Sequence, residues 1–186
     1  MSAAPPKTKL RARMRALRRA LARQTPDAAE RAAALAPLGR LPACQVIASY
    51  HPQGAELDPA PLVRALLARA PATVVFPAGE DRDHALLFRA GTPGEADAFG
   101  VPAPRADAPV HDPDLVIAPL LAFDASGARM GQGAGAYDRT IENLRGRRRV
   151  FVLGLAYSGQ EIDEIPAEPH DQRLDGVLTE TGYTEF

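Results

Sequence analysis

The sequence predicts an α/β fold in which one central, mostly parallel β-sheet is flanked by helices on both faces. Helical segments alternate along the chain with short strand segments, and the segments 45–50, 114–118 and 150–155 carry apolar residues at successive positions. Such runs are typical of parallel strands that are buried on both faces. The 186 residues contain no internal repeat and no long linker. A single domain over residues 1–186 is therefore expected, with a Rossmann-like order of three layers.

The first predicted element is a helix over residues 8–23. Its apolar residues recur at helical spacing and form one stripe, made of Leu10, Met14, Leu17 and Leu21. A second helix is predicted from about residues 25–27, where a proline occupies the first helical position, and it ends before Gly39. A strand at 45–50 and a loop follow, and residues 59–69 are predicted as a third helix.

Five more strands are predicted after the third helix. Pro77 is expected to stop the strand at 73–76, and the strand at 85–90 is predicted to pair with a neighbouring strand as a hairpin. Residues 91–113 are rich in Gly, Pro and Asp and are predicted as a long surface connection. A helix that includes residues 141–144 is expected to begin within a glycine-rich segment. The strands lie at 73–76, 85–90, 114–118, 150–155 and 174–178.

Charge is distributed unevenly along the chain. The first 40 residues carry ten Lys or Arg against only Asp27 and Glu30, although the net charge of the whole chain is −1. A basic helix of this kind raises the hypothesis of a nucleic-acid or membrane surface. The 5% aromatic content and the near-zero net charge argue against a nucleic-acid binder. No apolar run approaches the length of a membrane span, so neither nucleic acid nor membrane is expected as a partner.

The single cysteine, Cys44, excludes an intramolecular disulfide and any CxxC motif. It is expected to be a buried structural thiol beside the strand at 45–50. The N-terminal segment has no apolar core of a secretory signal, and its Arg-rich, acid-poor composition only faintly resembles a transit peptide. A cytoplasmic location is therefore expected.

Residues 129–139, RMGQGAGAYDR, are the strongest functional signal in the sequence. Alternating glycines that lead into a helix let backbone N–H groups converge on an anion, and the helix N-terminus adds positive potential. The segment lacks the Gly-Lys-Ser/Thr of a Walker A loop, and it lacks the strand and acid that flank a dinucleotide-binding GxGxxA. Phosphate is therefore the expected ligand, and an idle flexible turn is the alternative. Arg129 is a candidate phosphate clamp, and Asp138 is either a magnesium ligand or a helix-capping acid.

Two further acidic segments are candidates for binding. Glu56 and Asp58 follow a predicted strand and suit the N–H groups of a polar heterocycle. The alternative is that Asp58 caps the helix at Pro59 and Glu56 is solvated. In the segment 164–171, Asp171 is a candidate second metal ligand and His170 is either a ligand or a surface residue, with an ordinary surface loop as the alternative.

The chain resembles the 5-formyltetrahydrofolate cyclo-ligase family, also called 5,10-methenyltetrahydrofolate synthetases. The resemblance extends from Lys7 to about Thr179. It rests on five segments in the same order, of which the fourth is highly specific: residues 7–11 (KTKLR), 56–58 (ELD), 99–102 (FGVP), 123–139 (FDASGARMGQGAGAYDR) and 166–171 (PAEPHD).

The resemblance implies an ATP- and Mg²⁺-dependent ring closure of a reduced folate. In that family ATP phosphorylates the formyl oxygen on N5, N10 then attacks the activated carbon, and phosphate leaves. No protein nucleophile is needed, which agrees with the lack of a nucleophile elbow or a Cys-His pair in the sequence. A monomer is expected, with the reduced folate, polyglutamylated or not, as its small-molecule substrate.

The resemblance also implies roles for individual residues. Catalytic roles fall to Arg129, Tyr137 and Asp138. ATP binding falls to Lys7, Arg11, Arg129, Met130, Gly131, Gln132, Gly133, Ala134, Gly135, Ala136 and Tyr137. Substrate binding falls to Gln53, Glu56, Asp58 and Tyr50. Magnesium binding falls to Asp138 and Asp171. The other arginines of the basic head are then expected to be a solvated face.

The chain departs from the family pattern at two positions. Many relatives have an aromatic residue where Ala136 stands, and Pro59 replaces a usual Thr. Three alternatives therefore stay open: a paralogue of the same fold with another substrate, a basic nucleic-acid-binding protein, and a different ATP- or NAD-binding enzyme.

Overall fold

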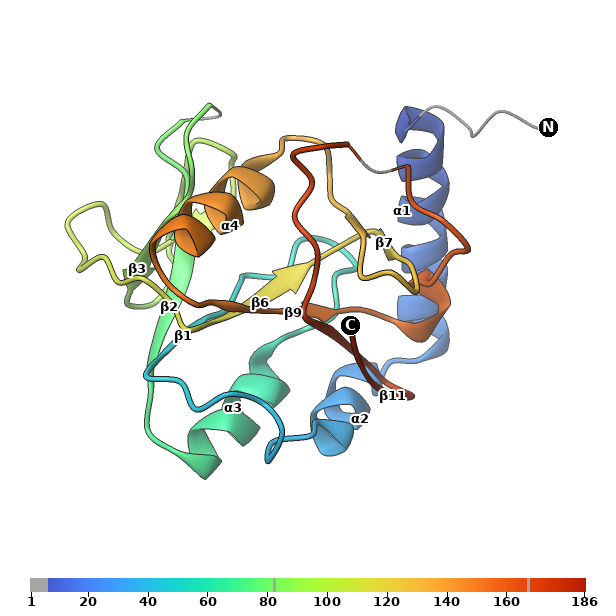
Figure 1. Ribbon diagram of the computed structural model, residues 1–186, viewed down its shortest axis with the longest axis horizontal. Coiled ribbons are helices and arrows are strands. Elements are labelled where there is room, and N and C mark those ends of the chain that lie inside the picture. The colour runs from blue at the N-terminus through green and yellow to red at the C-terminus, as the bar shows by residue number, and fades with distance from the viewer. Residues whose placement is uncertain (1–6, 82, 167) are drawn as a thin grey trace.

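The computed structural model describes residues 7–81, 83–166 and 168–186. A seven-stranded sheet forms its centre, in the order β11-β10-β9-β6-β1-β2-β3 (Figure 1). The strands from β10 to β2 run parallel, and β11 and β3 are antiparallel edges. The strands of this sheet are β1 (Val46–Ala48), β2 (Thr73–Ala78), β3 (Leu87–Ala90), β6 (Leu115–Pro119), β9 (Phe151–Leu155), β10 (Gly176–Thr179) and β11 (Gly182–Glu185).

Helices cover both faces of the sheet, so the predicted α/β architecture is confirmed. One apolar cluster joins α2 (Ala28–Leu35) and α3 (Ala60–Arg69) to one face, and a second joins α4 (Ala136–Arg147) to the other (Figure 1). The short 3-10 helix η1 (Ser158–Gln160) follows β9. None of the helices in the described residues combines the length and the apolar character needed to cross a membrane.

The central strands are buried on both sides, which explains their unbroken apolar sequence. In β6, Leu115 and Ile117 belong to the cluster under α2 and α3, whereas Val116 and Ala118 belong to the cluster under α4. All four side chains are fully buried. Alternate residues thus point to opposite faces, and the side chains on each face must be apolar because a helix packs against them.

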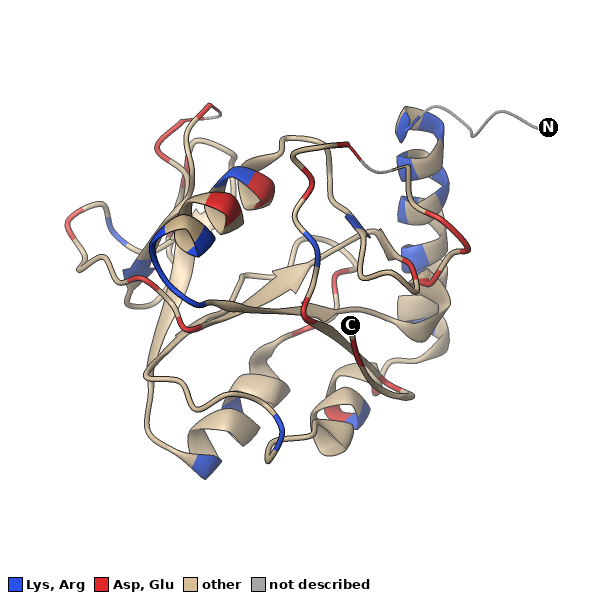
Figure 2. Ribbon diagram, in the orientation of Figure 1, with Lys and Arg blue, Asp and Glu red and all other residues tan. Residues whose placement is uncertain are grey.

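The first helix, α1 (Lys7–Gln24), packs at one end of the sheet instead of on a face (Figure 1). Its residues Leu10 and Met14 are buried against a small hairpin formed by β7 (Ala122–Phe123) and β8 (Arg129–Met130). Figure 2 shows the Lys and Arg residues concentrated along this helix. The hairpin reverses the chain between the sheet and the glycine-rich segment, and it places that segment beside α1.

Four details differ from the sequence prediction. Pro77 does not stop β2, which continues to Ala78 and pairs Pro77 with Phe88. The β1–β2 pairing ends at Val75, so Pro77 has only β3 as a neighbour and its missing N–H leaves no gap on the β1 side. The segment 91–113 contains a small hairpin of β4 (Glu95–Ala96) and β5 (Pro102–Ala103), and β11 was not predicted. Cys44 is only partly buried, so the prediction of a buried thiol is wrong.

Candidate functional site

A cavity of about 480 Å³ opens at the carboxyl ends of the parallel strands β1, β2 and β6. Ligand crevices of open α/β sheets lie at this edge. Tyr50 and His51 follow β1, Pro77 comes from β2, and Pro119 and Leu120 come from the end of β6. The structure brings almost all of the site residues expected from the sequence to this cavity: Lys7, Arg11, Tyr50, Gln53, Glu56, the unbroken segment 129–138, and Asp171.

The glycine-rich segment forms one wall of the cavity and leads into α4. Gly133 has a φ of +112° and Gly135 a φ of +67°, a region of backbone conformation that side chains disfavour. A Cβ atom at Gly133 would lie 3.3 Å from Cζ of Arg11, whose Nε donates to the Gly131 carbonyl at 3.2 Å. The glycines therefore keep the backbone bare beside a guanidinium and at a helix N-terminus, an arrangement that suits phosphate.

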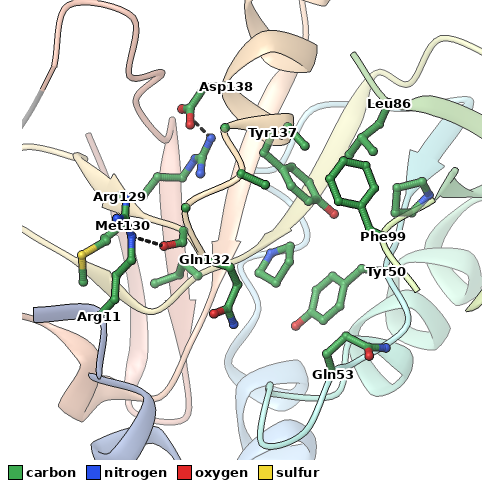
Figure 3. A pocket seen from close by; sticks show the side chains of 18 of the residues that line it. Arg11, Tyr50, Gln53, Leu86, Phe99, Arg129, Met130, Gln132, Tyr137 and Asp138 are labelled. Atoms are coloured by element: carbon green, nitrogen blue, oxygen red, sulfur yellow. Dashed lines mark hydrogen bonds and ion pairs between the residues drawn. The ribbon is translucent and has the colours of Figure 1, made fainter. Parts of the chain in front are cut away.

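Arg129 and Asp138 form an ion pair at the base of this segment (Figure 3). Arg129 Nη2 donates to Asp138 Oδ1 at 2.7 Å, with 2% of the Arg129 side chain and 18% of the Asp138 side chain exposed. The backbone N–H of Gln172 also donates to Asp138 Oδ1, at 3.0 Å. Burial lowers the pKa of Arg129, and the Asp138 charge offsets part of that effect. Asp138 is thus fixed by a cation and by the residue that follows Asp171.

Arg129 retains an unused donor, since its Nε is buried and has no hydrogen-bond partner among the described residues. Its guanidinium also lies 6.0 Å from the centre of the Tyr137 ring. A buried donor without a partner is uncommon in folded proteins. The residues around the glycine segment therefore fit an anionic group better than an empty turn.

Lys7 and Asp171 close the same wall from opposite ends of the chain. Lys7 Nζ lies 2.9 Å from Glu168 Oε1 and 3.3 Å from Asp171 Oδ2. Burial lowers the pKa of Lys7, but the hydrogen bonds and charges of these two acids outweigh it and the net shift is upward. Ligand atoms of Glu168, His170 and Asp171 lie within 4.8 Å of one another, a spacing that can hold a cation. Asp138 is outside that group but is joined to it through Gln172.

The opposite end of the cavity carries an acid and aromatic rings. Glu56 Oε2 accepts from the Gln53 N–H at 2.9 Å, and only 8% of the Glu56 side chain is exposed. The Tyr50 hydroxyl donates to the Leu57 carbonyl, and burial followed by the Glu56 charge raises the pKa of Tyr50 well above its ordinary value. Tyr50, Tyr137 and Phe99 are arranged around the open space in Figure 3. This end suits a flat, partly apolar ring with N–H donors.

Asp58 is the one expected site residue that does not line the cavity. It is exposed, and its Oδ1 accepts from the Ala60 N–H at 2.9 Å at the start of α3. This is the capping alternative considered for it, whereas the alternative of a solvated Glu56 is wrong because Glu56 is buried. Contact between Asp58 and a substrate stays a prediction.

Phe99 lines the cavity and was not predicted to have a role there. Asp97 accepts from the N–H groups of Gly79, Phe99 and Val101 at 2.9, 2.9 and 3.0 Å and so fixes the β4–β5 turn beside the sheet. A Cβ atom at Gly79 would lie 2.3 Å from the Phe99 ring. The sequence signal for Phe99 was the motif FGVP at residues 99–102. A loop has no periodicity, however, that would indicate where the Phe99 ring points.

Arg11 lines the cavity as expected, whereas two other arginines of α1, Arg15 and Arg18, have contacts that were not predicted. Arg11, Arg15 and Arg18 share one face of the helix, and they donate to the carbonyls of three residues around the hairpin: Gly131, Gln132 and Leu120. The prediction of a solvated face is wrong for Arg18, which is buried. Arg15 is partly exposed and bonds to Gln132 at the surface, and Arg13 and Arg19 are exposed as expected. Part of the basic charge therefore serves the cavity, which weakens the hypothesis of a nucleic-acid surface.

Comparison with known proteins identifies relatives over most of the chain. The family model described as the 5-formyltetrahydrofolate cyclo-ligase family matches residues 3–180. The 5-formyltetrahydrofolate cyclo-ligase of Haemophilus influenzae is 36% identical over 102 residues, which are 51% of this chain and 54% of that protein. That of Mycolicibacterium smegmatis is 43% identical over 70 residues, 38% of this chain and 35% of that protein. The matched parts thus span about half or less of the length of these curated relatives.

Solved structures share the fold. A 5,10-methenyltetrahydrofolate synthetase from Mycoplasma pneumoniae superposes with a TM-score of 0.73 at 23% identity, covering 95% of this chain and 99% of that chain. The 5,10-methenyltetrahydrofolate synthetase from Aquifex aeolicus gives a TM-score of 0.70 at 24% identity, covering 96% and 92%. At this level of identity the likeness concerns the fold.

Proposed function

Because the chain belongs to the 5-formyltetrahydrofolate cyclo-ligase family, we propose that it converts 5-formyltetrahydrofolate and ATP into 5,10-methenyltetrahydrofolate, ADP and phosphate. The observation that carries the proposal is that one cavity joins a bare, cation-lined glycine segment to an acid among aromatic rings. A phosphate donor and a flat heterocycle can therefore meet inside one enclosed space.

The reaction replaces a poor leaving group by a good one. The formyl oxygen on N5 takes the γ-phosphoryl group of ATP, N10 attacks the formyl carbon and loses its proton, and the oxygen departs as phosphate. In the transition state of phosphoryl transfer, negative charge is spread over the phosphate oxygens. Correct positioning of the reactants and nearby cationic groups therefore supply most of the catalysis. This chemistry needs no protein nucleophile.

The cationic end of the cavity is assigned to the triphosphate. The backbone of residues 131–135 and the side chains of Lys7 and Arg11 would bind its oxygens, and Arg129 would add its charge from the base of the segment. Magnesium, when bound with ATP, supplies further neutralisation of phosphate charge. Asp138 and Asp171 are the carboxylates assigned to hold it, and the linked Glu168 and His170 lie close enough to assist.

The aromatic end is assigned to the reduced folate. Glu56 would accept hydrogen bonds from ring N–H groups, and Tyr50, Phe99 and Tyr137 would exclude water from the reacting atoms. Gln53 holds Glu56 through its backbone N–H. Ala136 also lines the cavity, and its methyl group adds little side-chain bulk beside Tyr137.

The test is to mix purified protein with ATP, MgCl₂ and 5-formyltetrahydrofolate and to follow the absorbance of the methenyl product. Product should form only when ATP and magnesium are both present, with ADP and phosphate released in equal amounts. Absence of any ATP-dependent product would contradict the proposal. Stabilisation by ATP–Mg²⁺ in a thermal shift assay without methenyl product would instead indicate a paralogue with another substrate. The monomeric state and the cytoplasmic location stay predictions.

A further inference from the structure

Arg18 reaches from α1 to Glu56 and Leu120, two residues that line the cavity, without lining it itself. Its Nη1 lies 3.3 Å from Glu56 Oε1 and donates to the Leu120 carbonyl at 3.1 Å. Only 7% of the Arg18 side chain and 8% of the Glu56 side chain are exposed. Glu56 thus has one oxygen held by α1 and the other by the backbone N–H of Gln53. With both oxygens held in this way, Glu56 lines the cavity.

Burying a charged arginine side chain costs desolvation free energy, so the burial of Arg18 at this place requires a reason. Packing of α1 rests on the apolar residues Leu10 and Met14, which are buried against the β7–β8 hairpin. Arg18 itself is incompletely satisfied, since its Nε is buried without a hydrogen-bond partner among the described residues. A buried ion pair contributes little net stability compared with an apolar replacement. The pair is therefore better explained by what it does to Glu56 than by what it adds to the fold.

We propose that Arg18 is a positioning residue that keeps the Glu56 carboxylate oriented at the aromatic end of the cavity. This rests on the proposed function, in which Glu56 receives the N–H groups of the reduced folate. Burial, followed by the Glu56 charge, raises the pKa values of Tyr50 and Tyr137, so neither hydroxyl is a second anion beside Glu56. Arg18 is thus the cation in direct contact with this acid among the described residues.

The proposal separates the two ends of the cavity. Lys7 and Arg11 lie on the same helix as Arg18 and serve the glycine segment, so a merely structural role for Arg18 would disturb both ends when it is removed. A positioning role would disturb the Glu56 end alone. Loss of Arg18 should therefore weaken binding of the folate and leave binding of ATP unchanged.

The experiment measures KM for 5-formyltetrahydrofolate and for ATP in Arg18→Met, with the exposed neighbour Arg19→Met as the matched control. Arg18→Met should raise the folate KM by about tenfold or more, as expected for a lost hydrogen bond to a charged group, and should leave the ATP KM within about twofold. Arg18→Lys should recover part of the loss because its ammonium restores the charge. If Arg18→Met does not fold, Arg18→Gln makes the same test, since its amide keeps a donor for the Leu120 carbonyl.

A double-mutant cycle with Glu56→Gln completes the test. If Arg18 acts through Glu56, the double variant Arg18→Met/Glu56→Gln should have a folate KM no higher than Glu56→Gln alone. Additive effects, an equal rise in both KM values, or behaviour identical to Arg19→Met would overturn the proposal. A wild-type protein that forms no methenyl product would instead contradict the proposed function, so the two failures are distinct.

Discussion

The guanidinium of Arg129 is held by the carboxylate of Asp138 at 2.7 Å, with 2% of the arginine side chain exposed. These residues flank the glycine segment, Arg129 in β8 and Asp138 in the first turn of α4. The pair therefore closes the base of the segment and fixes how the strand and the helix meet. Any change at Asp138 acts on this geometry as well as on the carboxylate that the proposed function assigns to magnesium.

Replacing Asp138 should separate these two roles. Asp138→Asn keeps an oxygen that accepts from Arg129 and Gln172, so the fold should survive while turnover falls by about 10²-fold or more through loss of the negative charge. Asp138→Ala should in addition lose about 3–5 kcal/mol of stability, because it leaves Arg129 buried without its partner. Steady-state kinetics and urea unfolding measure the two effects. Full activity in Asp138→Asn would contradict a role for the charge.

The glycine segment should not tolerate a side chain at Gly133. Its φ of +112° disfavours alanine, and the added Cβ would lie 3.3 Å from Cζ of Arg11. Gly133→Ala should raise the KM for ATP and cost about 1–3 kcal/mol of stability. Gly146→Ala is the matched control, because Gly146 lies in α4 with open space around it; there alanine should stabilise the helix by about 0.5–1 kcal/mol and leave the kinetics unchanged. Equal kinetics in the two variants would argue against the proposed phosphate cradle.

Gly79 should control the position of the Phe99 ring. A Cβ atom at Gly79 would lie 2.3 Å from that ring, so Gly79→Ala forces the ring to move. The KM for 5-formyltetrahydrofolate should rise while the KM for ATP stays the same, because Phe99 lies at the aromatic end of the cavity. Phe99→Leu should give a similar change. A rise in the KM for ATP alone would contradict the assignment of Phe99 to the aromatic end of the cavity.

Asp124 should make the stability of the protein sensitive to acid. Burial raises the pKa of Asp124, but hydrogen bonds from Ser126, Ile165 and Ala128 outweigh it, and the net pKa is below the ordinary value. Since the folded pKa is lower than the unfolded pKa of about 4, the ionised group stabilises the fold above that pH. This contribution is lost as the pH falls through the folded pKa.

Urea unfolding of the wild type and of Asp124→Asn between about pH 3 and pH 7 tests this expectation. At pH 7 the variant should be less stable by about 1–3 kcal/mol, because an amide nitrogen cannot accept from the Ile165 N–H that Asp124 Oδ2 accepts at 2.9 Å. The difference should shrink toward the acidic end. A difference that is constant with pH would show that ionisation of Asp124 contributes nothing.

The fold and the place of the glycine segment were predictable because their signals are local. Apolar runs at 114–118 and 150–155 indicate strands buried on both faces, and the glycines of 131–135 indicate a bare backbone before a helix, which the structure places in the wall of the cavity. That this wall binds phosphate stays a prediction. The short strand β11 was missed because its four residues, GYTE, are largely polar and pair only at the sheet edge. The prediction for Pro77 was wrong because the free-energy cost of its missing N–H depends on the neighbouring strand. The pairing of β1 with β2 ends at Val75, before Pro77, and the sequence does not show this.

The aromatic end was less predictable because it depends on long-range contacts. Arg18 is one of several arginines in α1, and the sequence does not distinguish it from Arg19, yet one is buried against Glu56 and the other is exposed. Asp58 and Glu56 are two residues apart in the sequence, and both carry a carboxylate. Only the packing of the loop after β1 turns Glu56 inward and leaves Asp58 at the start of α3.

The contact of Lys7 with Asp171 joins residues 164 positions apart in the chain. Closing a loop of this length costs conformational entropy, so we expect this contact to form after the sheet has packed. The cavity should then be completed when α1 docks onto the hairpin. We therefore expect α1 to detach while the sheet persists. Ligand binding in the cavity should then be lost at a lower denaturant concentration than the sheet itself, and native-state hydrogen exchange should find α1 among the first elements to open.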